Sequence, residues 1–208
     1  MKRSDYGRST LERGDLDPDP LVQFERWLAE AVAADLVEPS AMTLATVGEG
    51  GQPDARIVLL RGTGDGGFQF FTNHDSKKGR DLSAHPAAAL VFFWNELERQ
   101  VRVRGSVSVV DSARSQAYFA SRPRASQLGA WLSRQSDEAP DGSDFPTGIN
   151  ALERRFAGVD VPMPAHWGGY HVTPHEIEFW QGRPSRLHDR FLYRRVRDGE
   201  WDVARLYP

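Results

Sequence analysis

Hydrophobic residues near the start of the chain recur at the spacing of an amphipathic helix. The apolar positions are Leu21, Phe24, Trp27, Leu28 and Ala31. Asp19 is suited to cap this helix and Pro20 to occupy its first turn. We therefore predict a helix that packs one face on the core. Residues 1–18 before it are polar and irregular, which indicates a flexible N-terminal arm.

From residue 42 the pattern changes to short apolar or alternating runs, separated by Gly, Asp, Asn and Pro. The predicted strands are Met42–Val47, Ala55–Arg61, Phe68–Thr72, Ala88–Trp94 and Val101–Val110. A helix is predicted over residues 76–84, between the third and fourth of these strands. Five strands at this spacing favour an antiparallel barrel or sandwich.

The second half of the chain mixes helical and strand patterns. Residues 112–134 are predicted to be helical with a break at Pro123, and an acidic Pro/Gly-rich loop follows over 137–148. The remaining predicted elements are a short helix at Asn150–Phe156 and strands at Tyr170–Trp180, Arg186–Arg195 and Trp201–Leu206. No repeat or second domain is evident. The expected class is α+β with a mostly antiparallel β core, in a single domain over 19–208.

Composition narrows the class of protein further. The chain has 208 residues, 39% of them hydrophobic and 26% charged, with no apolar run near the ~20 residues of a membrane helix. The polar N-terminus does not resemble a secretory signal. No cysteine is present, so disulfides and thiolate metal sites are excluded and a reducing cytoplasm is expected. A net charge of −3 argues against a general nucleic-acid binder.

Lysine is rare, which makes one adjacent pair conspicuous. Among 26 basic residues only Lys2, Lys77 and Lys78 are lysines. The pair lies in Asn73–Gly79, where a predicted strand leads into a helix, a place where backbone N–H groups and cations commonly hold phosphate. The order of a Walker A loop is absent, so ATP chemistry has no support. A chance pair on a surface helix is the alternative interpretation.

Two further groups of residues suit an anionic or flat ligand. Tyr118 and Arg122 are four apart on a predicted helix, and Ser126 falls in the first turn of the next. They could form a phosphate site or an ordinary solvated helix kink. Arg186, His188 and Arg190 alternate along a predicted strand and would share one face, near the large aromatic Trp180. A ligand surface and a solvated edge strand both explain that pattern.

Other chemistries find little support. His166, His171, His175 and His188 lack the helical pairing of a metal site, and no serine nucleophile elbow is present. A strand with Gln100, Arg102 and Arg104 lacks the aromatics of an RNA-binding strand. Cations, aromatics and amides without a nucleophile are typical of an enzyme whose cofactor performs the chemistry.

Many short stretches in one order resemble the pyridoxine/pyridoxamine 5′-phosphate oxidase family, from Arg3 to the C-terminus. They are Glu38–Met42, Arg56–Leu60, Phe70–Asn73, Ser76–Gly79, Glu98–Val101, Tyr118–Pro123, Ser126–Trp131, Trp167–Gly169, Glu178–Arg183, Arg186–Arg190 and Arg205–Pro208. The resemblance implies a split β-barrel with flanking helices and a homodimer with FMN at its interface. It also implies oxidation of pyridoxamine or pyridoxine 5′-phosphate to pyridoxal 5′-phosphate, with O₂ as acceptor and H₂O₂ as product.

The resemblance also implies roles for individual residues. The flavin residues would be Arg56, Ile57, Val58, Leu59, Leu60, Phe71, Thr72, Lys77, Lys78, Gln100, Gln135, Ser136, Trp180 and Arg190. The substrate phosphate would be held by Arg61, Tyr118, Arg122 and Ser126, while Arg3 and Tyr6 would close over the substrate. Arg186 and His188 would contact the pyridine ring and are the candidate catalytic residues.

The chain departs from the family pattern in three places. Arg61 stands where lysine is usual, Phe71 where tyrosine is common, and the loop 137–148 lacks the usual polar Ser/Arg pattern. Arg56 and Arg61 are five apart, so on an ideal strand they would lie on opposite faces. Two alternatives remain: a split-barrel flavin oxidase with another substrate, as in phenazine biosynthesis, and a non-catalytic protein that binds flavin or pyridoxal phosphate.

Overall fold

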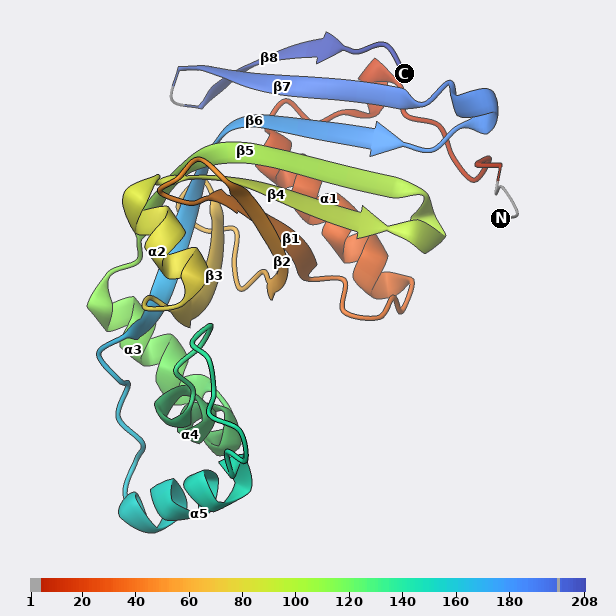
Figure 1. Ribbon diagram of the computed structural model, residues 1–208. Coiled ribbons are helices and arrows are strands. Elements are labelled where there is room, and N and C mark those ends of the chain that lie inside the picture. Colours follow the sequence, from red (N-terminus) through yellow and green to blue (C-terminus); the bar gives the residue numbers. More distant parts are fainter. Residues whose placement is uncertain (1–4, 198) are drawn as a thin grey trace.

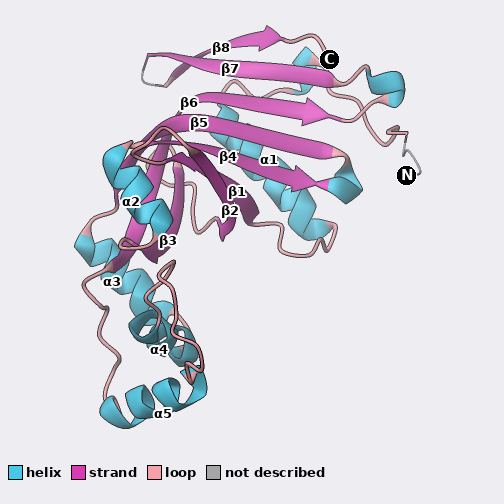
Figure 2. Cartoon of the chain, in the orientation of Figure 1, coloured by secondary structure: helices cyan, strands magenta, loops and turns pink. Residues whose placement is uncertain are grey.

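The computed structural model describes residues 5–197 and 199–208 (Figure 1). The helices are α1 (Pro20–Ala33), α2 (Lys77–Ala84), α3 (Ser112–Ser121), α4 (Arg124–Leu132) and α5 (Phe145–Arg155), with short 3₁₀ turns at Arg13–Asp15, Asn95–Leu97 and Pro184–Arg186. The strands are β1 (Ala41–Val47), β2 (Pro53–Leu59), β3 (Phe68–Asn73), β4 (Ala87–Trp94), β5 (Arg99–Val109), β6 (Trp167–Gln181), β7 (Asp189–Arg197) and β8 (Glu200–Arg205). Figure 2 shows the strands gathered in one body, with α1 and α2 against it and α3, α4 and α5 extending away from it.

One antiparallel sheet of eight strands forms the body, in the order β2-β1-β4-β5-β6-β7-β8, with β3 paired to β6 outside this path. The 15-residue strand β6 makes this arrangement possible. Its first part pairs with β3 and its last part with β7, while β5 pairs along its length. The sheet therefore curls into an open split barrel, and the α+β class with an antiparallel core is confirmed.

Alternation along the central strands separates a core face from an open face. Val101 and Val103 of β5 and Phe179 of β6 are fully buried, whereas the residues between them point outward. Helix α1 covers the core face, and its Phe24 packs edge-on against Phe68 at 4.9 Å. The side chain of Asp19 accepts a hydrogen bond from the Leu21 N–H, so the predicted helix start is confirmed.

Helices α3, α4 and α5 form a separate projection, here called the helical arm (Figure 1). A second apolar cluster of Phe119, Leu128, Phe156, Val161 and Trp167 holds it together. The predicted helix at Asn150–Phe156 is wrong in its start, because α5 begins at Phe145. Asp144 caps this helix by accepting the Thr147 N–H, which moves the last residues of the predicted loop into its first turn.

The described part of the N-terminal segment, residues 5–18, lies against the body. Leu11 is buried, and its N–H donates to the carboxylate of Asp189. The N–H groups of Gly7 and Arg8 both donate to Oε2 of Glu98 at 2.9 Å. These contacts place the segment beside the ends of β6 and β7.

Candidate functional site

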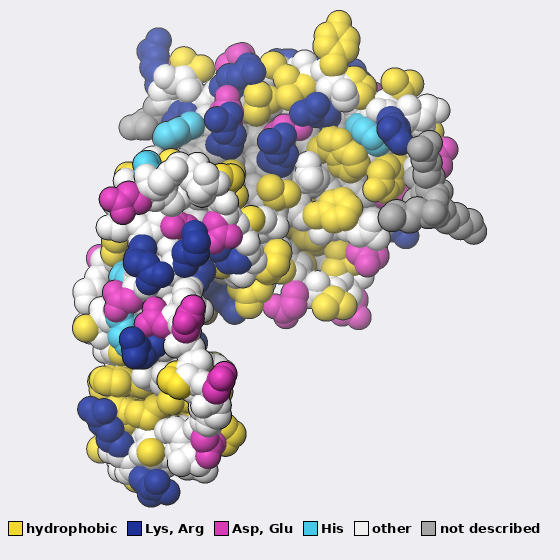
Figure 3. Space-filling view, in the orientation of Figure 1, with side chains coloured by type: hydrophobic (Ala, Val, Ile, Leu, Met, Phe, Trp, Pro, Cys, Tyr) yellow, Lys and Arg dark blue, Asp and Glu magenta, His cyan; other side chains and the backbone are white. Residues whose placement is uncertain are grey.

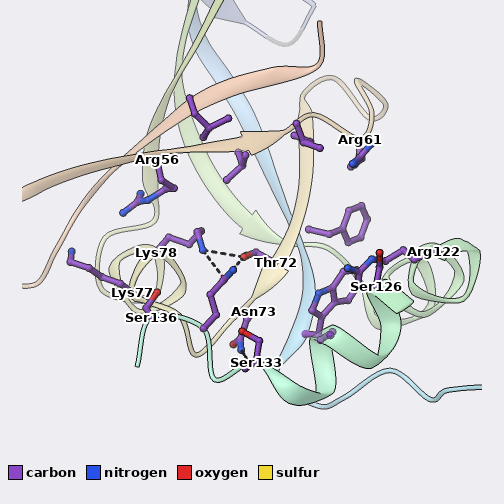
Figure 4. Close-up of a pocket in the computed structure, with 18 of the residues that line it drawn as sticks. Arg56, Arg61, Thr72, Asn73, Lys77, Lys78, Arg122, Ser126, Ser133 and Ser136 are labelled. Atoms are coloured by element: carbon purple, nitrogen blue, oxygen red, sulfur yellow. Dashed lines mark hydrogen bonds between the residues drawn. The ribbon is translucent and has the colours of Figure 1, made fainter. Parts of the chain in front are cut away.

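A cleft of about 820 Å³ lies between β2, β3, α2 and the helical arm (Figure 4). Fourteen of the residues that the sequence analysis assigned to ligands line it. They are Arg56, Ile57, Val58, Leu59, Arg61, Phe71, Thr72, Lys77, Lys78, Tyr118, Arg122, Ser126, Gln135 and Ser136. Leu60 does not line the cleft, because its side chain is buried in the core. The fold thus brings together residues from five separate segments of the chain.

One end of the cleft is centred on Lys78, in the first turn of α2 (Figure 4). Its Nζ lies 2.8 Å from Oε1 of Gln135 and 3.3 Å from Oγ1 of Thr72. Among the described residues no carboxylate forms an ion pair with it. Burial, and then the nearby Arg56, lower the pKa of Lys78 to about 8. A buried ammonium held only by neutral oxygens is suited to receive an anionic ligand.

The other two cations at this end are already paired with carboxylates. Arg56 lies 2.7 Å from Asp54 and 3.6 Å from Asp81, and Lys77 lies 3.1 and 3.3 Å from the same two carboxylates. The four side chains form a closed ring of ion pairs. The hydrogen bond from Lys77 is the main cause of the lowered pKa of Asp54, so this carboxylate is charged at neutral pH. Lys78 therefore carries the excess positive charge of this end.

The opposite end of the cleft contains Arg61, Arg122 and Ser126 (Figure 4). Nη1 of Arg122 is buried and has no hydrogen-bond partner within the described part of the chain. Its guanidinium stacks 4.7 Å above the ring of Trp167. Burial lowers the pKa of Arg122, Tyr118 opposes that effect, and the positive charge of Arg61 adds to it. Two neighbouring cations with an unused buried donor fit a phosphate group.

Aromatic rings form the wall beside this second end. Phe71 stacks on Tyr118 with centroids 4.1 Å apart and on Trp167 at 5.6 Å. The face of Phe71 is therefore covered by other rings.

Gln127 holds together the two helices that form the Arg122 end of the cleft. Its Nε2 donates to the carbonyls of Phe119 and Ala120, at 3.0 and 3.1 Å. These carbonyls belong to the last turn of α3, where free carbonyl groups need partners. The amide thereby joins the start of α4 to the end of α3 and holds the segment that carries Arg122 and Ser126.

The structure corrects two geometric expectations about this cleft. Arg61 does not belong to the strand of Arg56, because β2 ends at Leu59 and the chain turns to pair Arg61 N–H with the Gln69 carbonyl. The two arginines consequently line one cleft, and the opposite-face argument fails. Arg122 follows the last residue of α3, in extended conformation, yet it still lines the cleft together with Tyr118.

A second group of predicted residues lies at the ends of β5, β6 and β7, and is here called the C-terminal cluster: Tyr6, Gln100, Trp180, His188 and Arg190. The strand register places Gln100 beside Trp180 and Trp180 beside Arg190. The rings of Trp180 and His188 are 4.5 Å apart, and the Tyr6 ring meets Trp180 edge-on at 5.7 Å. None of these five residues lines the cleft described above.

The predicted strand face of Arg186, His188 and Arg190 is wrong. Strand β7 begins only at Asp189, and Pro184–Arg186 form a 3₁₀ turn in which Ser185 and Arg186 have φ of 56° and 63°. The Arg183 N–H donates to Nδ1 of His188 at 3.1 Å and closes this turn. Proline favours such a turn over a strand, and the exposed side chain of Arg186 follows from it.

The polar groups of the C-terminal cluster are largely engaged. Arg190 donates to Glu178 at 2.8 Å and to the carbonyl of Tyr207 at 3.0 Å. Burial, followed by the charges of Arg186 and Arg190, lowers the pKa of His188, which favours its neutral form. Because Nδ1 of His188 accepts a hydrogen bond, the proton of the neutral ring resides on Nε2.

Several residues of these sites were missed by the sequence analysis, namely Asp54, Asn73, Asp81, Ser133, Trp167 and Glu178. For two of these residues, Asp54 and Asp81, the spacing in the sequence could have indicated the site. Asp54 stands two residues before Arg56 on a strand, and Asp81 stands four residues after Lys77 on a helix, which are the spacings of side chains on one face. Ser133, whose carbonyl accepts from Asn73, carried no local signal, and Trp167 stood in a stretch of the family resemblance without a role assigned to it.

The open face of the sheet is visible beside the helical arm in Figure 3, with hydrophobic side chains and cations gathered over β5, β6 and β7. Predicted residue Arg3 lies outside the described residues. Within residues 5–197 and 199–208, no group of three or more His, Cys, Asp or Glu is arranged to hold a metal ion. Over the same ranges no helix has the length and apolarity needed to span a bilayer.

The fold and this geometry define a split-barrel protein with a cleft that presents cations at both ends. Comparison with known proteins makes the assignment specific. Residues 28–146 match the family model of pyridoxamine 5′-phosphate oxidase, and residues 167–208 match the model of the pyridoxine 5′-phosphate oxidase C-terminal dimerisation region. The chain belongs to the pyridoxamine 5′-phosphate oxidase family.

Individual relatives agree with this family. The chain is 52% identical over 208 residues to a pyridoxine/pyridoxamine 5′-phosphate oxidase of Burkholderia ambifaria, covering 99% of this chain and 97% of the relative. It is 55% identical over 206 residues to one from Ralstonia nicotianae, with the same coverage. Among solved structures, PhzG from Burkholderia lata in complex with tetrahydrophenazine-1-carboxylic acid has a TM-score of 0.89 at 30% identity, covering 96% of this chain and 98% of PhzG.

Proposed function

We propose that this protein oxidises pyridoxamine 5′-phosphate and pyridoxine 5′-phosphate to pyridoxal 5′-phosphate, using FMN, with O₂ as electron acceptor and H₂O₂ as product. The observation that carries the proposal is the pair of anion-binding ends in one cleft, Lys78 at one and Arg122 at the other. Cofactor and substrate are both phosphate esters, so a complex of the two needs two such ends. The names of the relatives, at 52–55% identity, support the same reaction.

The donors at the first end fit the phosphate of FMN. Lys78 supplies a charge without a carboxylate partner in the described structure, and Thr72 and Gln135 supply polar groups around it. Residues Ile57–Leu59 of β2 line the cleft beyond this end and would contact the flat ring. Bound FMN supplies an acceptor for two electrons, which no side chain of this protein offers.

The second end fits the phosphate of the substrate. Arg61 and Arg122 would form charged hydrogen bonds to it, with Tyr118 and Ser126 as further donors. Such contacts fix the substrate ring at one position relative to the flavin, and this positioning lowers the barrier of the reaction. Arg61 keeps the charge of the family's usual lysine and replaces a point charge with a planar fork.

Arg186 and His188 would act on the pyridine ring of the substrate. The lowered pKa of His188 keeps the ring neutral at physiological pH, so that Nε2–H can donate to a polar group of the substrate. Both residues lie in or beside the C-terminal cluster and not in the cleft of the same chain. We therefore propose a homodimer in which the C-terminal cluster of one chain completes the cleft of its partner. The match of residues 167–208 to a dimerisation region supports this arrangement.

A visible spectrum of the purified protein tests the proposal directly. We expect flavin absorbance that bleaches on anaerobic addition of pyridoxamine 5′-phosphate and returns with oxygen, with one H₂O₂ released for each aldehyde formed. A yellow protein that does not bleach would indicate a non-catalytic flavin-binding protein.

A second candidate is oxidation of a phenazine precursor, because PhzG is a close structural relative. The ligand described for PhzG is a carboxylic acid without a phosphate group, whereas this cleft offers both Arg61 and Arg122 at its second end. Turnover of tetrahydrophenazine-1-carboxylic acid in preference to pyridoxamine 5′-phosphate would replace the proposed substrate with this one.

A further inference from the structure

The carboxylate of Asp54 lies against two of the three cations at the Lys78 end of the cleft. Its Oδ2 is 2.7 Å from Nη2 of Arg56 and 3.1 Å from Nζ of Lys77. Asp54 itself lines the cleft, and its side chain is 37% exposed. The carboxylate therefore occupies a position on the ligand side of these cations.

Asp81 binds the same two cations and is held far more tightly. Its side chain is 6% exposed, and it accepts a hydrogen bond of 2.7 Å from Oγ1 of Thr46. It is absent from the cleft lining. Asp81 is thus a fixed part of the scaffold, whereas Asp54 is an exposed side chain near the start of β2.

The two terminal nitrogens of the Arg56 guanidinium, Nη1 and Nη2, donate to different partners. Nη1 donates to Oγ1 of Thr46 at 2.7 Å and to the carbonyl of Leu44 at 3.3 Å. Nη2 donates to Asp54. Release of Asp54 would leave Nη2 only its longer contact with Asp81, at 3.6 Å, while Nη1 keeps the guanidinium in place, so Nη2 can donate to another anion without rearrangement.

We propose that Asp54 is an internal competitor for the anion site: its carboxylate binds Arg56 and Lys77 in the free protein and is displaced by the phosphate of the incoming ligand. The proposal rests on the proposed function only in naming FMN as that ligand. Asp81 already neutralises Arg56 and Lys77 in part, so a phosphate added beside Asp54 would be the third anion on two cations, and repulsion between the anions favours release of the exposed Asp54. The hydrogen bond from Lys77 keeps the pKa of Asp54 low, which makes the competition present throughout the neutral range. Asp54 consequently weakens phosphate binding and speeds its exchange.

The test is an equilibrium titration of apoprotein with FMN, followed by flavin fluorescence, for the parent and for Asp54→Asn. We expect the variant to bind FMN about three- to tenfold more tightly, the range in which a partly exposed ion pair acts. Riboflavin, which lacks the phosphate, should bind both proteins equally. Asp75→Asn is the matched control, because Asp75 is an exposed acid two residues before Lys77 that does not line the cleft.

A second measurement requires no flavin. Inorganic phosphate should raise the thermal midpoint of apo Asp54→Asn more than that of the parent. Unchanged or weaker FMN binding in Asp54→Asn, or an equal gain in Asp75→Asn, would overturn the proposal while leaving FMN binding itself intact. Absence of FMN binding in every protein, together with the expected phosphate effect, would instead refute the cofactor and keep the competition by Asp54.

Discussion

The cleft and the C-terminal cluster use similar residues in different ways. In the cleft, Lys78 and Nη1 of Arg122 are buried donors whose charges meet no carboxylate among the described residues. In the C-terminal cluster, Arg190 is held by Glu178 and the carbonyl of Tyr207, and the backbone of Arg183 donates to His188. A buried charge without a counter-ion, such as Lys78, and a buried donor without an acceptor, such as Nη1 of Arg122, are both costly, so a protein retains them where a ligand satisfies them. In the C-terminal cluster the hydrogen-bonding groups are instead largely satisfied within the chain, so the cluster forms a rigid contact surface on the open face of the sheet.

The cleft is therefore suited to hold anions, whereas the C-terminal cluster presents aromatic rings and a neutral imidazole. The cleft would bind both phosphates within one chain. The C-terminal cluster would contribute to chemistry only when another surface is brought to it. The following substitutions and conditions test this division between the two regions, beginning with the largest expected effect.

Lys78→Ala should have the largest effect, a loss of FMN affinity of about a hundredfold. The reason is that charged hydrogen bonds contribute up to about 3 kcal/mol, and no other cation at this end is free of carboxylates in the described structure. Fluorescence titration with FMN measures it. Arg80→Ala, an exposed cation on the same helix, is the control and should change the affinity little. Equal affinities for Lys78→Ala and the parent would refute the assignment of this end.

Arg61→Ala should raise KM for pyridoxamine 5′-phosphate about ten- to a hundredfold with kcat and the flavin spectrum unchanged, because it removes a charged contact to a part of the substrate that does not react. Steady-state kinetics measure the split. Arg61→Lys should keep most activity, and unphosphorylated pyridoxamine should be a poor substrate that Arg61→Ala affects little. Equal damage to both substrates would make Arg61 structural and strengthen the phenazine-type alternative.

The pH dependence of FMN binding should follow Lys78, whose pKa is lowered to about 8 in the free protein. The protonated amine binds the phosphate, so affinity is full below pH about 8 and falls as pH rises through that value, by up to about tenfold per unit. Titrations between pH 7 and 9.5 measure this. Lys78→Arg stays charged over the whole range and should remove the slope. A slope that persists in Lys78→Arg would assign the titration to another group.

Mixed dimers provide the test with the smallest expected signal. Lys78→Ala disables the cleft and His188→Ala the C-terminal cluster, so either homodimer should be nearly inactive. Random mixing makes about half of the dimers mixed, each with one intact site, and activity should recover to about a quarter of the parent. Tagged co-expression and pull-down isolate the mixed dimers, which should then have about half of the parent activity because one of their two sites is intact. If mixed dimers stay as inactive as the homodimers, each site is built within one chain.

Prediction from the sequence located most of the secondary structure, because the signals for helices and strands are local. The cap and first turn of α1, the break at Pro123 and the alternation along β4 and β5 each depend on neighbouring residues. Its errors arose where a turn signal competed with a longer pattern. Pro184 starts a turn inside an apparently alternating run, and Asp144 caps a helix within an apparent loop.

The sequence by itself determined the class of fold, the family and the set of residues that are suited to two phosphate groups. These follow from periodicity, helix caps and ordered motifs, which depend on residues that are close together in the sequence. Only the tertiary structure decided which of those residues share a site. It placed Arg56 and Arg61 in one cleft, separated Trp180 and Arg190 from it, and set Asp54 against Arg56 and Lys77. The physical reason is that contacts between distant segments depend on strand pairing and packing, and no local pattern encodes which distant side chains will meet.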